Sequence, residues 1–156
     1  MLLDRALIMS LIPHQGTMCL HDAVLEWDTQ SLQLRSAGHR SPTHPLRSSD
    51  RLHAVHLCEY GAQAMAVHGG LLARADGKVA VPGMLVSLRQ VQLMCARIDT
   101  LTGELITHAE RIHGDDSSWQ YSFRVEHHGT RLASGRAAVM ARHVTHPLSH
   151  ASKVIP

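Results

Sequence analysis

The residue best placed to do chemistry in this sequence is Glu59, because its neighbours along the chain are mostly small or apolar. It lies within residues 51–72, RLHAVHLCEYGAQAMAVHGGLL. At helical spacing these small and apolar residues fall along two stripes, which predicts an enclosed helix. A carboxyl group in such a helix is unfavourable unless it is paired, hydrogen-bonded or kept neutral. Glu59 is therefore a candidate acid or base, and a solvated or structural carboxyl group is the alternative.

Histidines near Glu59 raise the alternative of a metal site. His53, His56 and Glu59 lie on one helical side, and three more histidines stand near the end of the chain, at positions 143, 146 and 150. Neither group has the spacing of a zinc finger or of an H-E-x-x-H motif. The sequence therefore favours proton transfer at Glu59, and we expect no metal.

Length and composition are those of one ordinary soluble domain. The chain has 156 residues, of which 44% are apolar and 18% are charged. A net charge of +2 and few aromatic residues argue against a nucleic-acid partner. No long apolar run occurs, so we expect neither a signal peptide nor a membrane span. Cys19, Cys58 and Cys95 are odd in number and far apart, which predicts reduced thiols in a cytoplasmic protein.

The hydrophobic pattern predicts a helix, a hairpin and a long helix in the first half of the chain. Residues 3–12 have helical spacing and stop before Pro13. The hairpin is formed by residues 19–27, which are rich in apolar groups, and by residues 30–37, in which apolar and polar residues alternate. Turn-forming residues then predict a loop at 38–50 before the helix of residues 51–72. The expected caps of that helix are Ser49 or Asp50 at its start and Gly69 and Gly70 at its end.

After this helix the hydrophobic period changes to that of strands. The alternation predicts four of them, at residues 79–95, 104–112, 119–126 and 132–139. One enclosed helix followed by an antiparallel meander predicts an α+β domain in which a curved sheet wraps the helix. We assign residues 1–142 to this single domain and residues 143–156, which lack periodicity, to a C-terminal tail.

Three segments of the sequence carry a resemblance to a known family. They are residues 11–18, LIPHQGTM, with the Leu25-Glu26-Trp27 that follows; residues 58–64, CEYGAQA; and residues 82–88, PGMLVSL. In these segments the chain resembles the hotdog-fold 3-hydroxyacyl-[acyl-carrier-protein] dehydratases, most closely the group from aryl polyene pigment clusters. The resemblance implies a hotdog fold, in which a curved antiparallel sheet wraps one long central helix. It also implies a dimer, formed either by two copies of this chain or with a second hotdog dehydratase.

The same resemblance implies chemical roles at the site. The family's acid falls on Glu59, and its base falls on His44, with His39 as the fallback. Gln63, one helical turn after Glu59, would orient its carboxyl group or else satisfy a buried backbone group. His14 also has a counterpart in the family, and we expect it to pack the N-terminal segment onto the sheet.

Substrate contacts implied by the resemblance lie at the start of the helix and on the strand after it. Backbone N–H groups would hold the thioester carbonyl, and the acyl chain would run along the strand. The expected substrate-binding residues are Leu52, His53, Ala54, Val55 and Gly83, together with Gln63. The substrate would arrive on the phosphopantetheine of an acyl carrier protein, so we expect no separate cofactor. Basic residues that could meet this acidic partner are Arg40, Arg47, Arg51, Arg89 and Arg97.

The implied function is dehydration of 3-hydroxyacyl thioesters to trans-2-enoyl thioesters in fatty-acid-like or aryl polyene synthesis. Two departures from the family pattern support an alternative. His44 lies one residue further from Glu59 than the family's base does, and Leu52-His53-Ala54 stands where the family has Pro-Gly. These departures favour a non-catalytic subunit of a heterodimer. A hotdog acyl thioesterase, in which Glu59 activates water, is the second alternative.

Overall fold

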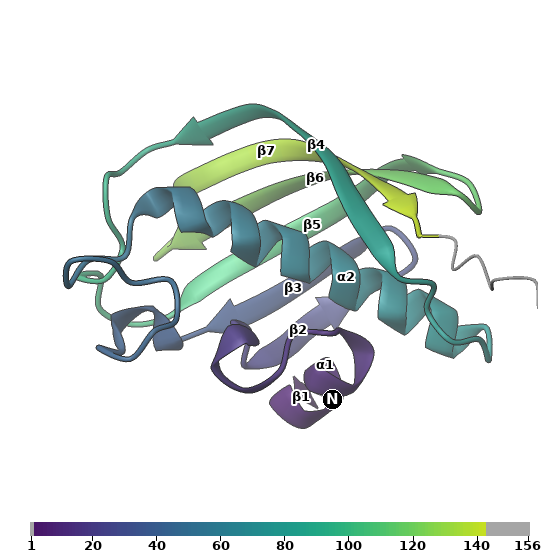
Figure 1. Ribbon diagram of the computed structural model, residues 1–156, viewed down its shortest axis with the longest axis horizontal. Coiled ribbons are helices and arrows are strands. Elements are labelled where there is room, and N and C mark those ends of the chain that lie inside the picture. Colours follow the sequence, from purple (N-terminus) through teal and green to yellow (C-terminus); the bar gives the residue numbers. More distant parts are fainter. Residues whose placement is uncertain (1, 143–156) are drawn as a thin grey trace, which may run out of the picture.

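The computed structural model describes residues 2–142 as one long helix held against a curved antiparallel sheet (Figure 1). The helix is α2 (Leu57–Ala75), and a short 3-10 turn, Ala54–His56, leads into it. The short helix α1 (Arg5–Leu11) packs beside α2. The predicted α+β class, with a curved sheet around one central helix, is thus confirmed. The predicted tail at residues 143–156 lies outside the described residues.

In the described part of the chain the sheet has seven strands, and each pairs antiparallel with its neighbours in the order β1-β2-β3-β5-β6-β7-β4. The strands are β1 (Leu3–Asp4), β2 (Ala23–Trp27), β3 (Ser31–Ser36), β4 (Gly83–Leu93), β5 (Leu105–Gly114), β6 (Ser118–His127) and β7 (Thr130–Ala141). β4 follows α2 in the sequence and pairs with β7 at the far edge of the sheet. The hairpin and all four later strands are present as predicted, although β4 begins at Gly83 rather than at residue 79.

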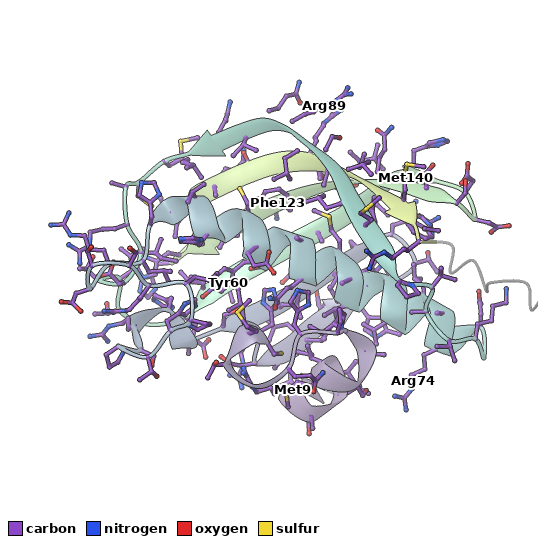
Figure 2. All side chains as sticks on the ribbon, in the orientation of Figure 1. Met9, Tyr60, Arg74, Arg89, Phe123 and Met140 are labelled. Carbon is purple, nitrogen blue, oxygen red and sulfur yellow. The ribbon has the colours of Figure 1, made fainter. Side chains whose placement is uncertain are left out.

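The buried face of α2 packs on the inner face of the sheet and forms most of the core. Ala64 and Leu71 belong to one apolar cluster and Tyr60 to a second. Phe123 of β6 lies between α2 and the sheet (Figure 2). A Cβ atom at Gly61 would stand 2.5 Å from Phe123 Cδ2, so a larger residue at this position would force the helix away from the ring. Glycine therefore sets how closely α2 approaches the sheet.

The start of the long helix differs from the prediction. Residues 51–53 are not helical, and α2 begins at Leu57. Ser49 and Asp50 do not cap the helix, because the N-cap of α2 is His56 and that of the preceding 3-10 turn is His53. Ser49 and Asp50 lie in an earlier turn, with positive φ angles of 50° and 61°. The helical spacing of apolar residues in the sequence includes Leu52, which is fully buried although it is not part of a helix. The predicted helix therefore began too early.

The end of α2 also differs from the prediction. Gly69 and Gly70 do not end the helix, which continues to Ala75. A Cβ atom at Gly70 would stand 2.9 Å from Leu11 Cβ, so this glycine permits α1 to pack against α2. In the described part of the chain no helix is long and apolar enough to cross a membrane.

The first helix is shorter than the predicted residues 3–12. Asp4 accepts the N–H of Leu7 at 3.0 Å and so caps α1 at its start. Leu3–Asp4 instead pairs with β2 as the first strand of the sheet. A short sheet contact has therefore replaced the first turn of the predicted helix.

β4 is an edge strand with exposed side chains on both of its faces. Ten of its eleven residues are exposed, and within residues 2–142 its outer edge has no pairing partner. The exposed aliphatic residues of β4 and its flanks include Val81, Met84, Val86, Leu88, Val91 and Leu93. A long apolar edge strand tends to aggregate unless another element covers it. This edge is therefore suited to pairing with another chain.

Among residues 2–142 four histidines are buried within the subunit: His21, His39, His44 and His68. The ring of His21 is wholly enclosed, with Nδ1 2.8 Å from Ser36 Oγ and Nε2 2.8 Å from the carbonyl oxygen of Tyr60. Burial lowers the pKa of His21 to about 4. Burial also lowers the pKa of the other three rings. Each of these side chains is stabilised in its neutral form.

We expect the fold to lose stability as the pH falls from about 6.5 toward 4. In this window the unfolded chain takes up a proton on His21, whereas the folded chain does not, so protonation favours unfolding. The contribution of His21 to the free energy of unfolding is fully present above pH 6.5, the pKa of this group in the unfolded chain. It amounts to about 3 kcal/mol and is lost as the pH falls to about 4. Urea unfolding at several pH values measures it. His21→Asn should flatten the dependence, whereas His128→Asn, at an exposed turn, should not; equal slopes for all three proteins would contradict this account.

Candidate active site

Glu59 lies in the first turn of α2, on a side of the helix that the subunit leaves partly open. Its side chain is 34% exposed. The next residue, Tyr60, is fully buried. The sequence predicted a helix enclosed on all sides, so the exposure of Glu59 is a correction. A carboxyl group in this position is anchored in the core through its helix and can still reach a ligand.

The amide of Gln63 fixes the Glu59 carboxyl group from one helical turn away. Gln63 is fully buried, and its Nε2 donates to Glu59 Oε1 at 3.1 Å and to the carbonyl oxygen of Met18 at 2.7 Å. Its Oε1 accepts the N–H of Leu20 at 2.9 Å. The expected hydrogen bond to Glu59 and the alternative of satisfying buried backbone groups are therefore both present. A contact between Gln63 and substrate stays a prediction.

His14 is the second side chain at Glu59. Its Nε2 lies 3.2 Å from Glu59 Oε1, and its side chain is 30% exposed. Its Nδ1 is buried and has no hydrogen-bond partner among residues 2–142. The sequence predicted only a packing role for His14 and did not indicate that it lies at the site. The histidine within the segment LIPHQGTM was the signal that could have suggested otherwise.

His44, the predicted base, is held inside the subunit. It is 8% exposed, and its Nδ1 accepts the N–H of Leu46 at 3.1 Å. Because Nδ1 is an acceptor, Nε2 carries the ring proton, and it donates to the Tyr60 hydroxyl at 3.1 Å. His39 is also buried, with Nε2 2.7 Å from the carbonyl oxygen of Leu101. The structure therefore places neither His44 nor His39 against Glu59 of the same subunit.

Most of the backbone N–H groups predicted to hold the substrate carbonyl already have partners. Leu52 N–H donates to Asp99 Oδ1 at 2.9 Å and Ala54 N–H to the carbonyl oxygen of Ala96 at 3.0 Å. Val55 N–H donates to His53 Nδ1 at 3.0 Å. Of these four predicted residues, only His53 has an N–H without a partner within residues 2–142. The segment before α2 can thus offer one backbone donor.

Asp99 fixes the segment that leads into α2, and sequence analysis did not single it out. It accepts the N–H of Leu52 and forms an ion pair with Arg97. The hydrogen bond from the Arg97 guanidinium holds the pKa of the Asp99 carboxyl group well below its usual range. Asp99 therefore stays ionised and keeps the start of the helix segment in place.

Gly83 was predicted to border the acyl chain. It begins β4 and pairs with Ala141 of β7. A Cβ atom at this position would stand 2.8 Å from Val139 Cγ1. Packing of β4 on β7 therefore explains the glycine, and contact with an acyl chain stays a prediction.

One hollow of the subunit lies away from Glu59. It has a volume of about 790 Å³ and is lined by residues of the sheet strands β3 to β7. Its walls are mostly polar and include Gln33, Gln92, His108, Ser122, Arg124 and Arg136. Such walls do not suit an acyl chain, so we place the candidate site at Glu59. Within residues 2–142 no group of three or more His, Cys, Asp or Glu side chains is arranged to hold a metal ion.

A curved antiparallel sheet around one helix that carries a carboxyl group defines a protein of the hotdog class. The family model for the ApeP dehydratase, ApeP-like, matches residues 6–149. The chain therefore belongs to the ApeP-like dehydratase family. This confirms the family indicated by the three segments of the sequence.

Solved structures share the fold at low sequence identity. A chain of the dehydratase heterocomplex ApeI:P from Xenorhabdus doucetiae is 20% identical, with a TM-score of 0.80 over 88% of this chain and 92% of that chain. A putative thioesterase from Shewanella oneidensis is 12% identical, with a TM-score of 0.61 over 88% and 93%. A hypothetical thioesterase from Streptococcus pneumoniae, solved with coenzyme A, is 11% identical, with a TM-score of 0.57 over 76% and 84%. No curated protein compared with the chain matches it.

We expect Gln63→Leu to lower the free energy of unfolding by about 2–4 kcal/mol. The change leaves the N–H of Leu20 and the carbonyl oxygen of Met18 buried without their present partner. Gln15→Leu is the matched control, because Gln15 also donates two hydrogen bonds to carbonyl groups but is exposed. Urea unfolding measures both variants. Equal losses would show that burial of the Gln63 amide does not stabilise the site.

Proposed function

We propose that the protein dehydrates 3-hydroxyacyl thioesters carried by an acyl carrier protein to trans-2-enoyl thioesters. The observation that carries the proposal is the Glu59 carboxyl group, which Gln63 and His14 hold through Oε1 alone. Its Oε2 makes no hydrogen bond with the described residues and is left for a ligand. Membership of a dehydratase family supports the same reaction.

The proposed role of Glu59 is that of the general acid. A neutral carboxyl group donates its proton to the C3 hydroxyl, which leaves as water while the double bond forms between C2 and C3. The free N–H of His53 would donate to the thioester carbonyl, where negative charge develops as the C2 proton is removed. The phosphopantetheine of the carrier protein brings the substrate, so the reaction needs no further cofactor.

Part of the predicted basic surface remains free for an acidic carrier protein. Arg47 donates to the carbonyl oxygens of Asp50 and Arg40, and Arg97 pairs with Asp99. The other three arginines of the predicted set are exposed and form no ion pair within residues 2–142: Arg40, Arg51 and Arg89. The side chain of Arg89 projects away from the sheet (Figure 2). We propose these three as contacts for the carrier protein, in the cytoplasm.

A dimer through β4 completes the proposal. The strand is exposed on both faces, and its outer edge is unpaired as far as residues 2–142 are concerned. These features support antiparallel pairing with the same edge of a second hotdog subunit. The related ApeI:P structure is a heterocomplex, which supports a second dehydratase as the partner. Two copies of this chain are the alternative.

Glu59→Gln should reduce dehydration by about 10²- to 10⁴-fold, because the amide cannot donate the carboxyl proton. The substrate is a short 3-hydroxyacyl thioester of an acyl carrier protein, and ultraviolet absorbance records the enoyl thioester. Glu110→Gln is the matched control, since Glu110 is exposed on β5.

The same mixtures distinguish the alternatives. Release of free carrier-protein thiol without enoyl product would identify a thioesterase. Absence of both products, with this chain alone and with its hotdog partner, would identify a non-catalytic subunit.

Leu88→Lys should dissociate the dimer, because it places a charge within the apolar edge of β4. Ile112→Lys, at an exposed aliphatic residue of β5, should leave the dimer intact. Sedimentation velocity of the chain, alone and with its partner, gives the mass. A dimer that persists in Leu88→Lys would place the interface elsewhere.

A further inference from the structure

We propose that His14 is a positioning residue that, together with Gln63, places the acidic proton of Glu59 on Oε2, the oxygen left for substrate. This inference rests on the proposed dehydration and deepens it, because it specifies which atom of Glu59 gives up the proton. The contacts that carry it meet at Glu59 Oε1. Gln63 Nε2 lies 3.1 Å from this oxygen, and His14 Nε2 lies 3.2 Å from it.

The orientation of the Gln63 amide is fixed by its two other partners. Gln63 Oε1 accepts the N–H of Leu20 at 2.9 Å, and a backbone N–H can only donate. Gln63 Nε2 donates to the carbonyl oxygen of Met18 at 2.7 Å, and a carbonyl oxygen can only accept. The reversed amide would lose both hydrogen bonds. Gln63 therefore turns an N–H group toward Glu59, and Glu59 Oε1 accepts it.

The surroundings of the His14 ring determine which of its nitrogens carries the proton. A neutral imidazole has one N–H donor and one bare acceptor nitrogen. His14 Nδ1 is buried with no hydrogen-bond partner among residues 2–142. Among buried backbone groups an unpaired N–H is rarer than an unpaired acceptor, and the same desolvation cost applies to a ring. The proton therefore lies on Nε2, which faces Glu59 Oε1, and the ring is neutral because an imidazolium would bury a second N–H at Nδ1.

His39 has the same arrangement and provides a second example within the chain. Its ring is buried, and its Nδ1 also lacks a partner in the described part of the chain. Its Nε2 lies 2.7 Å from the carbonyl oxygen of Leu101, which can only accept. In His39 the partnered nitrogen is thus the donor and the buried Nδ1 is the bare nitrogen, as we infer for His14.

Two N–H donors at Oε1 leave Oε2 as the atom that carries the proton of neutral Glu59. One oxygen of a neutral carboxyl group is a carbonyl and the other is a hydroxyl. A carbonyl oxygen has two lone pairs, one for each of these donors, so Oε1 is the carbonyl. Oε2 makes no hydrogen bond with residues 2–142, and the side chain is 34% exposed. The proton on Oε2 is therefore available to the C3 hydroxyl of a substrate.

The same two donors stabilise Glu59 after it has given up its proton. Oε2 protonates the C3 hydroxyl, the C3–O bond breaks and its electron pair leaves with water, and the C2–H electron pair forms the C2=C3 bond. The remaining carboxylate keeps both donors at Oε1, and hydrogen bonds to an ion are stronger than those to a neutral group. A separate base takes the C2 proton, the role predicted for His44, because His14 Nε2 already carries one. Proton exchange with water then restores the acid and the base.

Nuclear magnetic resonance measures the tautomer of His14 and does not depend on activity. A long-range proton–nitrogen correlation spectrum of the protein labelled with nitrogen-15 at histidine distinguishes the two neutral tautomers from the imidazolium. The signal that is lost in His14→Gln assigns the ring. We expect the neutral form with its proton on Nε2 near neutral pH. A proton on Nδ1, alone or in addition to one on Nε2, would overturn the proposal.

Kinetics separates donation by His14 from simple packing, with a 3-hydroxyacyl thioester of the carrier protein as substrate. His14→Leu removes the N–H and should lower kcat by about 10- to 10²-fold with little change in KM, because the lost hydrogen bond is to Glu59 and not to substrate. His14→Gln places an amide N–H in a similar position and should restore most of the lost kcat. His113→Leu is the matched control, since His113 is exposed on β5, and should have no effect.

Other outcomes separate the failure of this assignment from that of the proposed function. If the wild type is active and His14→Leu keeps its kcat, the dehydration stands and His14 does not position the acid. The same conclusion follows if His14→Gln is as slow as His14→Leu, because the N–H is then not what matters. If the wild type forms no enoyl thioester, the proposed dehydration fails and His14 has no role in it, while the spectrum still decides which nitrogen of His14 donates to Glu59.

Discussion

Two hydrogen bonds of one buried amide, that of Gln63, fix the position of α2 relative to residues 18–20. The same amide holds Glu59 Oε1 and so selects the orientation of the carboxyl group. His14, the other side chain at Glu59, lies on the loop that precedes those residues. A side chain with fewer polar atoms could not join the helix, the loop and the carboxyl group at once.

Close packing around α2 gives the site its rigid support. Gly61 allows Phe123 to approach one side of the helix, and Gly70 allows Leu11 to approach another. Tyr60 adds a polar connection within the core, since its hydroxyl accepts from His44 and its carbonyl oxygen contacts His21. The partly open side at Glu59 is thus backed by a tightly packed interior. Such support holds catalytic groups more precisely than a flexible loop would.

Local patterns in the sequence predicted the parts of the site and fold that depend on near neighbours. The spacing of Glu59 and Gln63 on one helix, and the alternation of β5, β6 and β7, are properties of short segments. The start of α2 could not be predicted in this way, because the partners of Leu52 and Ala54 lie far along the chain, at Asp99 and Ala96. Hydrogen bonds between segments that are far apart in the sequence therefore determine where α2 begins.

The histidine at the site was missed for a related reason. His14 and Glu59 are far apart in sequence, and only the packing of α1 on α2 brings them together. His44 had the expected residue type and nearly the expected spacing, and within the subunit its Nε2 donates to the Tyr60 hydroxyl. Its role as the base stays a prediction.

The most direct test of the account determines whether the Glu59 carboxyl group lies against C3 of the substrate. A 2,3-epoxyacyl thioester of the carrier protein is electrophilic at that carbon and forms an ester with an adjacent carboxyl group, and peptide mass spectrometry locates the modified residue. A Cys58→Ser background removes the neighbouring thiol. The account predicts modification of Glu59. A labelled protein in which Glu59 is unmodified would contradict it.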